Sequence, residues 1–374
     1  MRKKTKKRLF TTLIILILLV FGCLYFFKGY FVKKTDDEEV PKIEEKIKEY
    51  NVSFTLAGNV LINSNMWNDT RTNEGYDFEP IFQKANDIMK KSDVNFYFQG
   101  SILGGKDLGS SLNYNYNSPD ELINSLTKMK FNMVSLASYH SYDKGINGIK
   151  NSIKLLKDKE VAFSGVRDSE KDEENNIITK RDVKIGLLSY TIGTDENRLE
   201  DYAVNIYSDE KAKSDIEKIK NKVDILIVSI DWNNLNSVEV TEKQKEIATT
   251  LSNLGANIIV GNNSYSIQKI EKINDTLVCY SLGNLLSGHT LVDSRISAMA
   301  DFNVKVTKEN ETKVDIGDVN ISLYYTYNIN GGNYKVIPFA EIEDELTNYK
   351  EYYDKYKELL TKDNNNIKFY NIGD

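Results

Sequence analysis

The sequence predicts an α/β domain, built from mixed β-sheets flanked by helices, behind one N-terminal transmembrane helix. Three observations support this fold class. The 374 residues are 40% hydrophobic, as in ordinary globular proteins. One uncharged apolar run lies near the N-terminus, and short β-branched runs then alternate with helical stretches. Two cysteines exclude a disulfide-stapled scaffold, and two histidines exclude a metal centre built from several imidazoles.

The apolar run covers residues 9–27, which at about 1.5 Å per residue approaches the roughly 30 Å of a bilayer core. A basic flank, residues 1–8, precedes it, and Lys28 ends it. Because basic flanks stay in the cytoplasm, we expect a single-pass protein of the cell membrane, with its C-terminal domain extracellular. A cleaved signal peptide is the alternative, but no small-x-small site follows the run.

The charge is divided unevenly along the chain. Residues 1–34 hold nine Lys and Arg and no acid, which leaves 40 basic against 55 acidic residues and a net charge of −15 beyond them. Such a domain has no basic surplus for nucleic acid and repels an anionic polymer unless cations or local basic patches intervene. We expect a charged spacer at 28–50, the α/β domain at 51–290, and strands and a helix at 291–374 that complete or extend it.

Local patterns predict the individual elements. Strands are expected at 52–57, 132–137, 161–164, 183–190, 223–230, 257–260 and 276–282, and strand pairs within 301–325. Ser118 opens a predicted capping box, and Thr241 with Gln244 opens another, whose helix ends at Gly255. Helical spacing of apolar residues predicts a terminal helix within 341–360.

Polar residues follow four of the predicted strands directly. Because ligands of open α/β sheets bind beyond the carboxyl ends of the strands, we expect these residues to converge on one crevice. The four segments are Ala57-Gly58-Asn59, Ser138-Tyr139-His140-Ser141-Tyr142-Asp143, Asp231-Trp232-Asn233 and Gly261-Asn262-Asn263-Ser264-Tyr265.

Six motifs occur here in a fixed order. They are Gly58-Asn59, Phe98-Gln99-Gly100 with Ile102-Leu103-Gly104-Gly105, Tyr139-His140 with Asp143, Asp231-Trp232-Asn233, Gly261–Tyr265 with Gln268–Glu271, and Tyr280-Ser281-Leu282-Gly283-Asn284. Their order and spacing resemble the CapA-type family of capsule and poly-γ-glutamate synthesis proteins. The resemblance covers roughly residues 52–286 and implies a calcineurin-like metallophosphoesterase sandwich.

The resemblance also places the family's presumed metal ligands on seven positions, of which only one keeps the family's residue type, His140. The seven are Asn59, Gly100, Tyr139, His140, Asp231, Asn263 and Tyr265. Two-metal hydrolysis needs cations about 3.5–4 Å apart and carboxylates to neutralise them. A single catalytic zinc ion is usually bound by three protein ligands. We therefore expect no catalytic residue, no metal and no cofactor: a pseudoenzyme that keeps the fold.

Several of these residues also have simpler interpretations. His140 can be a loop histidine bonded to backbone, and Asp231 can turn the chain after its strand. Trp232 is expected to pack in a wall rather than to form a sugar platform. Asp143 is expected to bond its own loop backbone, and His289 to lie on the surface. Tyrosines 139, 142 and 265 either fill volume left by metals or line a groove for glycan or peptide.

Three functions remain compatible with the sequence. In the first, a membrane-anchored, non-catalytic protein binds an envelope polymer or partner and helps capsule or cell-wall polymer assembly. In the second, a metal-dependent hydrolase works with a reduced site of His140 and Asp231. In the third, the single span pairs with subunits of a polymer synthase or exporter, so that function depends on the helix. We favour the first.

Overall fold

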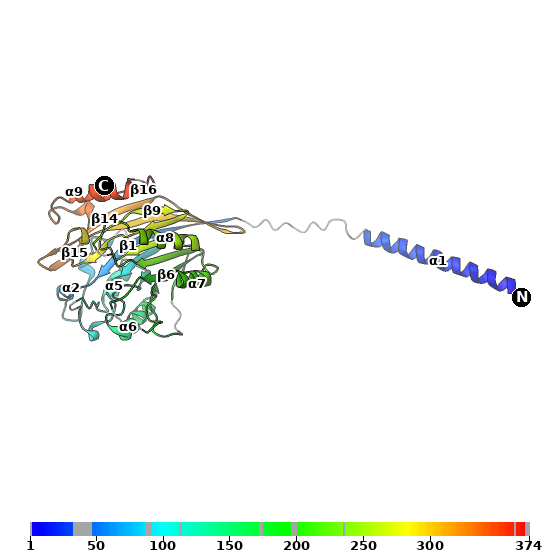
Figure 1. Ribbon diagram of the computed structural model, residues 1–374, viewed down its shortest axis with the longest axis horizontal. Coiled ribbons are helices and arrows are strands. Elements are labelled where there is room, and N and C mark those ends of the chain that lie inside the picture. The colour runs from blue at the N-terminus through cyan, green and yellow to red at the C-terminus, as the bar shows by residue number, and fades with distance from the viewer. Residues whose placement is uncertain are drawn as a thin grey trace. The chain divides into compact units, whose positions relative to one another are not determined.

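The computed structural model describes residues 2–32, 47–86, 92–111, 114–171, 175–195, 200–234, 236–362 and 364–370. The chain divides into two compact units, Met1–Lys46 and Ile47–Asp374 (Figure 1).

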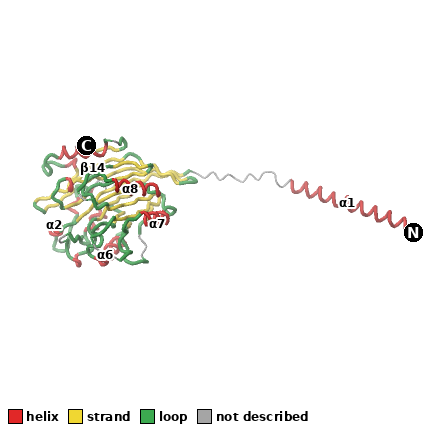
Figure 2. Tube along the Cα trace, in the orientation of Figure 1, coloured by secondary structure: helices red, strands yellow, loops and turns green. Residues whose placement is uncertain are grey.

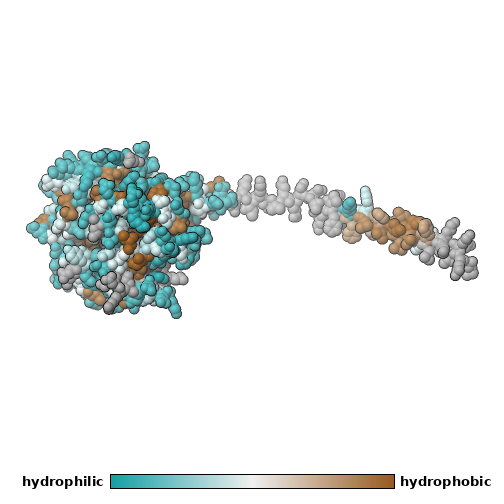
Figure 3. All heavy atoms as spheres, in the orientation of Figure 1, coloured by the Kyte–Doolittle hydropathy of each residue, from teal (hydrophilic) through white to brown (hydrophobic). Residues whose placement is uncertain are grey.

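The first unit contains the helix α1, Arg2–Val32. Its segment Phe10–Lys28 has a mean hydropathy of 2.6, and none of it is buried against protein. Figure 3 shows this stretch as a continuous apolar surface. The predicted apolar helix is therefore confirmed as an element, long and apolar enough for a membrane span or a signal sequence. Most of the predicted spacer, residues 33–46, lies outside the described residues.

In the second unit, one ten-stranded mixed sheet has the order β15-β14-β12-β1-β2-β3-β4, with β11 beside β1, β13 beside β12 and β16 beside β14. Its first strand begins at Lys48, within the predicted spacer 28–50, because residues 48–51 pair with 305–308 of β12. The bounds are β1 Lys48–Leu61, β2 Val94–Gln99, β3 Met133–Ser135, β4 Ala162–Ser164, β11 Asn284–Ser287, β12 Ile296–Lys308, β13 Thr312–Ile316, β14 Val319–Ile329, β15 Gly332–Pro338 and β16 Ile367–Phe369.

The other sheet has six strands in the order β5-β6-β7-β8-β10-β9. β6, β7, β8 and β10 run parallel, and β5 and β9 pair antiparallel at the two edges. The bounds are β5 Ile177–Lys180, β6 Val183–Thr191, β7 Ile225–Asp231, β8 Ile258–Asn262, β9 Ile270–Ile273 and β10 Thr276–Cys279.

Alternation along the strands builds three apolar layers. Ile225 and Ile227 of β7 join the core between the sheets with Phe54 of β1, whereas Leu226 and Val228 face the helices α7 and α8. The far face of the larger sheet is covered by α5 and α6. The predicted α/β class is thus confirmed as two mixed sheets face to face with helices outside them (Figure 2).

The helices begin where local and tertiary contacts allow. They are α2 Ser64–Asp69, α3 Glu79–Phe82, α5 Leu122–Lys128, α6 Gly145–Asp158, α7 Asp209–Ile219, α8 Glu242–Leu254 and α9 Tyr349–Thr361, with short 3-10 turns at Lys106–Leu108, Asp293–Arg295 and Phe339–Glu341.

The capping box at Thr241 and the left-handed stop at Gly255 are confirmed. The predicted box at Ser118 is wrong, because its hydroxyl lies 2.8 Å from that of Ser101, and α5 starts later, at Leu122.

Residues beyond 290 contribute to the same core. β12 pairs with β1 over ten residues, and β14 continues that sheet. The strand pairs predicted within 301–325 are present. The predicted helix 341–360 is shorter, because α9 begins only at Tyr349, and the strand β16 follows it. Tyr353 and Tyr356 of α9 are buried in the core between the sheets, as their spacing predicts.

Candidate functional site

Three of the polar segments predicted to converge lie at the carboxyl ends of β3, β7 and β8. The fourth, Ala57-Gly58-Asn59, lies inside β1, which continues to Leu61 instead of ending before this segment. We call the four segments, with Tyr116 and His289, the loop cluster. In this part of β1 the register with β2 shifts between Leu56 and Asn59, which marks a bulge. A Cβ on Gly58 would lie 2.0 Å from the carbonyl oxygen of Gly283, so only glycine allows the two backbones this approach.

Asp231 is the centre of the cluster's hydrogen bonds. Its fully buried carboxylate accepts the backbone N–H groups of Tyr139, at 2.6 Å, and Asn233, at 2.9 Å. It also accepts the side-chain amide of Asn263, at 3.2 Å. Burial raises the pKa of Asp231 to about 6, although these three donors and His140 act in the opposite direction. One carboxylate therefore joins the loops after β3, β7 and β8.

His140 and Asp143 form a second buried pair. The His140 Nδ1 lies 3.0 Å from Asp143 Oδ2, and the same oxygen accepts the backbone N–H of Tyr116, at 2.6 Å. The expectation that Asp143 bonds its own loop backbone is wrong, since it bonds a side chain of its loop and the backbone of the segment before α5. The rings of Tyr116 and Tyr139 stand edge-on to His140, at 4.6 and 5.3 Å between centroids.

Asn59 and Gly100 form one unit. The Asn59 amide donates to Asn284 Oδ1 at 3.0 Å, and Asn284 in turn donates to the carbonyl oxygen of Ser294 at 2.8 Å. A Cβ on Gly100 would lie 2.1 Å from Asn59 Oδ1. The Asn59 side chain therefore occupies the space beside position 100, and a side chain there would require Asn59 to move.

Tyr265 and His289 pack together, with ring centroids 4.5 Å apart. The expectation that His289 lies on the surface is wrong: β11 pairs with β1 and carries the following residues inward, so that His289 is partly buried and burial lowers its pKa. Tyr265 itself has a φ of +59°, an uncommon backbone conformation for an aromatic residue.

Trp232 lies apart from this hydrogen-bonded network. It is only 2% exposed, and its indole N–H donates to the carbonyl oxygen of Tyr280 at 2.7 Å. A Cβ on Gly261 would lie 1.9 Å from that indole nitrogen, so the glycine admits the ring. Trp232 is therefore packed as a wall residue.

The structure thus brings the predicted residues together in two linked groups. Tyr139, His140, Asp143, Asp231 and Asn263 form the first. Asn59, Gly100 and Tyr265 form the second, in which Asn284 bonds both the Asn59 amide and, at 3.5 Å, the Tyr265 carbonyl oxygen.

Sequence reasoning missed two contributors, Tyr116 and His289. The run Tyr114–Asn117, an alternation of tyrosine and asparagine, is the signal that could have drawn attention to Tyr116.

The side chains present do not fit a two-cation centre. Within the described ranges, no three His, Cys, Asp or Glu residues are grouped so that they could hold a metal ion. Both oxygens of Asp231 already accept N–H donors, and His140 Nδ1 is used by Asp143. Asn59 and Asn263 offer only neutral amides, and both amide nitrogens donate to protein acceptors.

Fold and site together define a class: a two-sheet α/β sandwich whose loop cluster lies at the carboxyl ends of parallel strands. The sequence places the chain within that class. The profile of the family described as bacterial capsule synthesis protein PGA_cap matches residues 53–289, so the chain belongs to this family.

Individual relatives are distant. The chain is 22% identical over 320 residues to the PGA biosynthesis protein CapA of Bacillus subtilis (strain 168), an alignment that covers 81% of this chain and 78% of the relative. It is 22% identical over 337 residues to the capsule biosynthesis protein CapA of Bacillus anthracis, with 85% and 78% covered. Among solved structures, the NAD nucleotidase of Haemophilus influenzae aligns with a TM-score of 0.44 and 14% identity over 86% of this chain and 64% of that one.

Proposed function

We propose that this chain is a membrane-anchored, non-catalytic member of the PGA_cap family. Its loop cluster binds a segment of an envelope polymer, or a protein partner that carries one, and so assists the assembly of capsule or cell-wall polymer. The α1 helix anchors it, with the basic N-terminus in the cytoplasm and the domain outside the cell, as the charge rule favours.

One observation carries the non-catalytic role. The side chains at the positions matched to metal ligands are bonded or packed with one another or with neighbouring residues such as Asp143, Asn284 and His289. The Asp231 carboxylate is itself the acceptor of three N–H donors. Replacing cations by hydrogen bonds keeps the loops in place while it removes the Lewis acid that a phosphoesterase of this class needs. The contact between Asn59 and Gly100 supports the same conclusion, since a carboxylate at position 100 would have to displace the Asn59 side chain from its bond with Asn284.

The chemistry of the cluster favours a hydrogen-bonding, largely neutral ligand. Three of its buried polar atoms, Asn59 Oδ1, Asn262 Oδ1 and His289 Nε2, have no partner among the described residues. Buried polar atoms of this kind are usually satisfied by water or by a ligand. The tyrosine rings at positions 116 and 139 supply apolar faces of the kind that sugar rings and peptide groups stack on.

Metal content is the first test of this proposal. We expect the full chain, purified in mild detergent and dialysed, to hold no stoichiometric Mn, Fe or Zn and to hydrolyse no phosphate ester. One equivalent of metal together with an activity that His140→Ala abolishes would establish the reduced-site hydrolase instead. The buried His140–Asp143 pair is the feature that favours that alternative, because such a pair can orient an imidazole as a base.

Binding is the second test. Tyr116→Ala with Tyr139→Ala should weaken binding to isolated wall glycan or peptide by about 1–3 kcal/mol, the range for aromatic anchors. Tyr370→Ala is the matched control, because that residue is 53% exposed and lies outside the loop cluster. If the double variant binds wall material as tightly as the parent and has the same unfolding midpoint, the loop cluster does not bind the polymer. Exchange of residues 9–27 for an unrelated span would then test whether α1 itself pairs with synthase or exporter subunits.

A further inference from the structure

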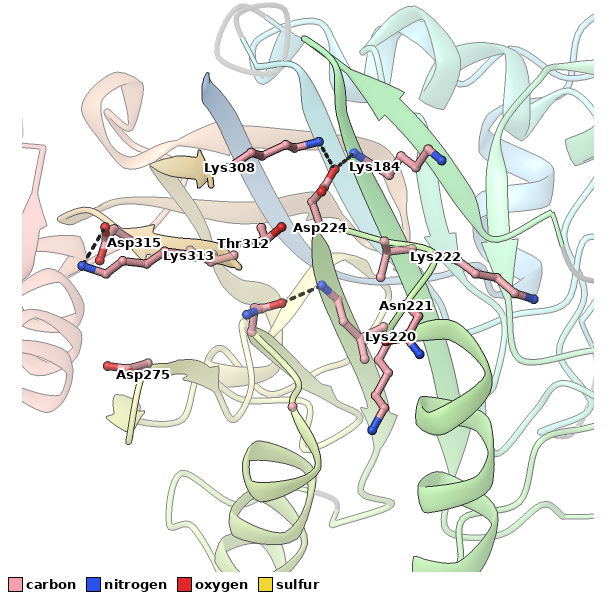
Figure 4. Close-up of a pocket in the computed structure, with 15 residues that line it drawn as sticks. Lys184, Lys220, Asn221, Lys222, Asp224, Asp275, Lys308, Thr312, Lys313 and Asp315 are labelled. Carbon is pink, nitrogen blue, oxygen red and sulfur yellow. Dashed lines mark hydrogen bonds and ion pairs between the residues drawn. The ribbon is translucent and has the colours of Figure 1, made fainter. Parts of the chain in front are cut away.

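A second feature lies at the opposite end of the smaller sheet from the loop cluster. A pocket of about 810 Å3 opens where β6, β7 and β8 begin, beside the hairpin of β12 and β13 (Figure 4). Asp224 in its wall precedes β7, whereas Asp231 of the loop cluster ends that strand. The pocket therefore belongs to a different site, and neither the family resemblance nor the candidate function uses it.

The pocket is basic in an acidic domain. Five lysines contribute to its lining: Lys184, Lys220, Lys222, Lys308 and Lys313. Three aspartates oppose them: Asp224, Asp275 and Asp315.

Two of these aspartates are already neutralised. Lys308 Nζ lies 2.7 Å from Asp224 Oδ2, and Lys313 lies 3.6 Å from Asp315. Lys184, Lys220 and Lys222 are exposed and have no ion pair among the described residues, so that only Asp275 remains to balance three charges. In Figure 4 the ammonium groups of Lys220 and Lys222 lie at the ends of extended side chains, clear of every marked contact. The four-carbon stem of lysine lets such a group move onto an anion.

The position of the pocket indicates which anion it meets. β1 begins at Lys48, which pairs with Lys308 of the pocket wall, so the chain enters the folded unit beside the pocket. Fifteen residues separate Val32, the end of α1, from Lys48. At no more than about 3.6 Å per residue they span at most roughly 54 Å. If α1 is a membrane anchor, this covalent link limits how far Lys48 can lie from the end of α1.

We infer that this pocket binds the phosphate groups of anionic lipids on the outer face of the membrane. The inference rests on the proposed membrane anchor. Anionic headgroups attract nearby lysines, and a tether raises their effective concentration at the pocket.

The test uses the full chain in nanodiscs of phosphatidylcholine, with or without phosphatidylglycerol, at low salt. Amine acylation followed by mass spectrometry reports the reactivity of each lysine. We expect Lys220 and Lys222 to react about fivefold more slowly in the anionic discs, since each nearby headgroup contact is of that order, and the difference to vanish in high salt. Lys150 and Lys159, exposed residues of α6 and its C-terminus, are the controls and should react equally in both discs.

Variants and a soluble competitor sharpen the result. Lys220→Gln with Lys222→Gln should abolish the lipid-dependent protection of Lys184, and Lys150→Gln with Lys159→Gln should leave it. Equal labelling of the pocket lysines in both discs would refute the inference, and equal protection by inorganic phosphate in phosphatidylcholine discs would refute its lipid source. If the chain fails to enter the discs, α1 is not a membrane anchor and the proposed function fails. If the chain enters the discs and its pocket lysines are labelled equally in both, only the lipid-binding role of the pocket is refuted.

Discussion

Replacement of Asp231 by asparagine tests whether burial at the centre of the loop cluster raises the pKa of this carboxylate. Burial raises the pKa of Asp231 from an ordinary value of 3.8 to about 6 in the folded protein. The folded state therefore binds the proton more tightly than the unfolded chain does. The stability that this group contributes is fully present below pH 4 and is lost as the pH rises through about 6.

The magnitude follows from the size of the shift. A shift of about two pKa units corresponds to roughly 3 kcal/mol in all, of which about 2.4 kcal/mol falls between pH 4 and pH 8 and slightly more than 1 kcal/mol between pH 5 and pH 7. Asparagine has nearly the shape of the protonated acid but cannot ionise. The free energy of unfolding of Asp231→Asn minus that of the parent should therefore rise by about 2.4 kcal/mol from pH 4 to pH 8, and the variant should gain relative stability at neutral pH.

Urea unfolding of the full chain in nonionic micelles, followed by tryptophan fluorescence at a series of pH values, measures this difference. Asp93→Asn is a control of opposite sign. Burial acts to raise the pKa of Asp93, but its bonds to Arg181 and Ser53 outweigh burial and lower it, so its contribution is lost as the pH falls. A difference curve for Asp231→Asn that is flat from pH 4 to pH 8 would refute the reasoning, because the carboxylate would then titrate alike in both states.

Three further predictions concern packing and capping, each measured by urea unfolding. Gly100→Glu should destabilise the domain by about 1–3 kcal/mol, because its Cβ would meet Asn59 Oδ1, and an unchanged midpoint would contradict that packing. Asn59→Asp should cost about 1–3 kcal/mol by removing the donor to Asn284, unless the loss is recovered by added metal, which would favour the hydrolase. Thr241→Ala should lower the free energy of unfolding by about 1 kcal/mol, because the helix loses its N-terminal cap. Thr249→Ala, on the exposed face of α8, is the control and should not lower it. Equal effects of the two substitutions would show that the capping box does not stabilise α8.

Local patterns in the sequence were enough to predict most elements and the region of the site. Apolar runs of the right length found α1 and seven strands, and the Thr241–Gln244 box found the start of α8 because capping involves only neighbouring residues. The β2 strand, Val94–Gln99, was not predicted, although Val94, Phe96 and Phe98 alternate with more polar residues. All six residues are buried, and the polar ones are accommodated by contacts that the local pattern does not contain, such as the bond from the Asn95 amide to the carbonyl oxygen of Lys130. The Ser118 box failed because Ser101, seventeen residues earlier, competes for the same hydroxyl.

The sequence by itself therefore determined the family, the α/β class, the apolar helix and the residues that gather at the strand ends. What those residues do was decided only by tertiary structure. Asp231 accepts donors from three loops, Asn59 fills the space above Gly100, and His289 packs on Tyr265. These contacts form only because the fold brings together strands from distant parts of the chain. The basic pocket has the same origin, since its five lysines come from three separate segments of the chain, at 184, 220–222 and 308–313. Hydrogen bonds and excluded volume act over a few ångströms, so their partners are fixed only once the sheets have paired.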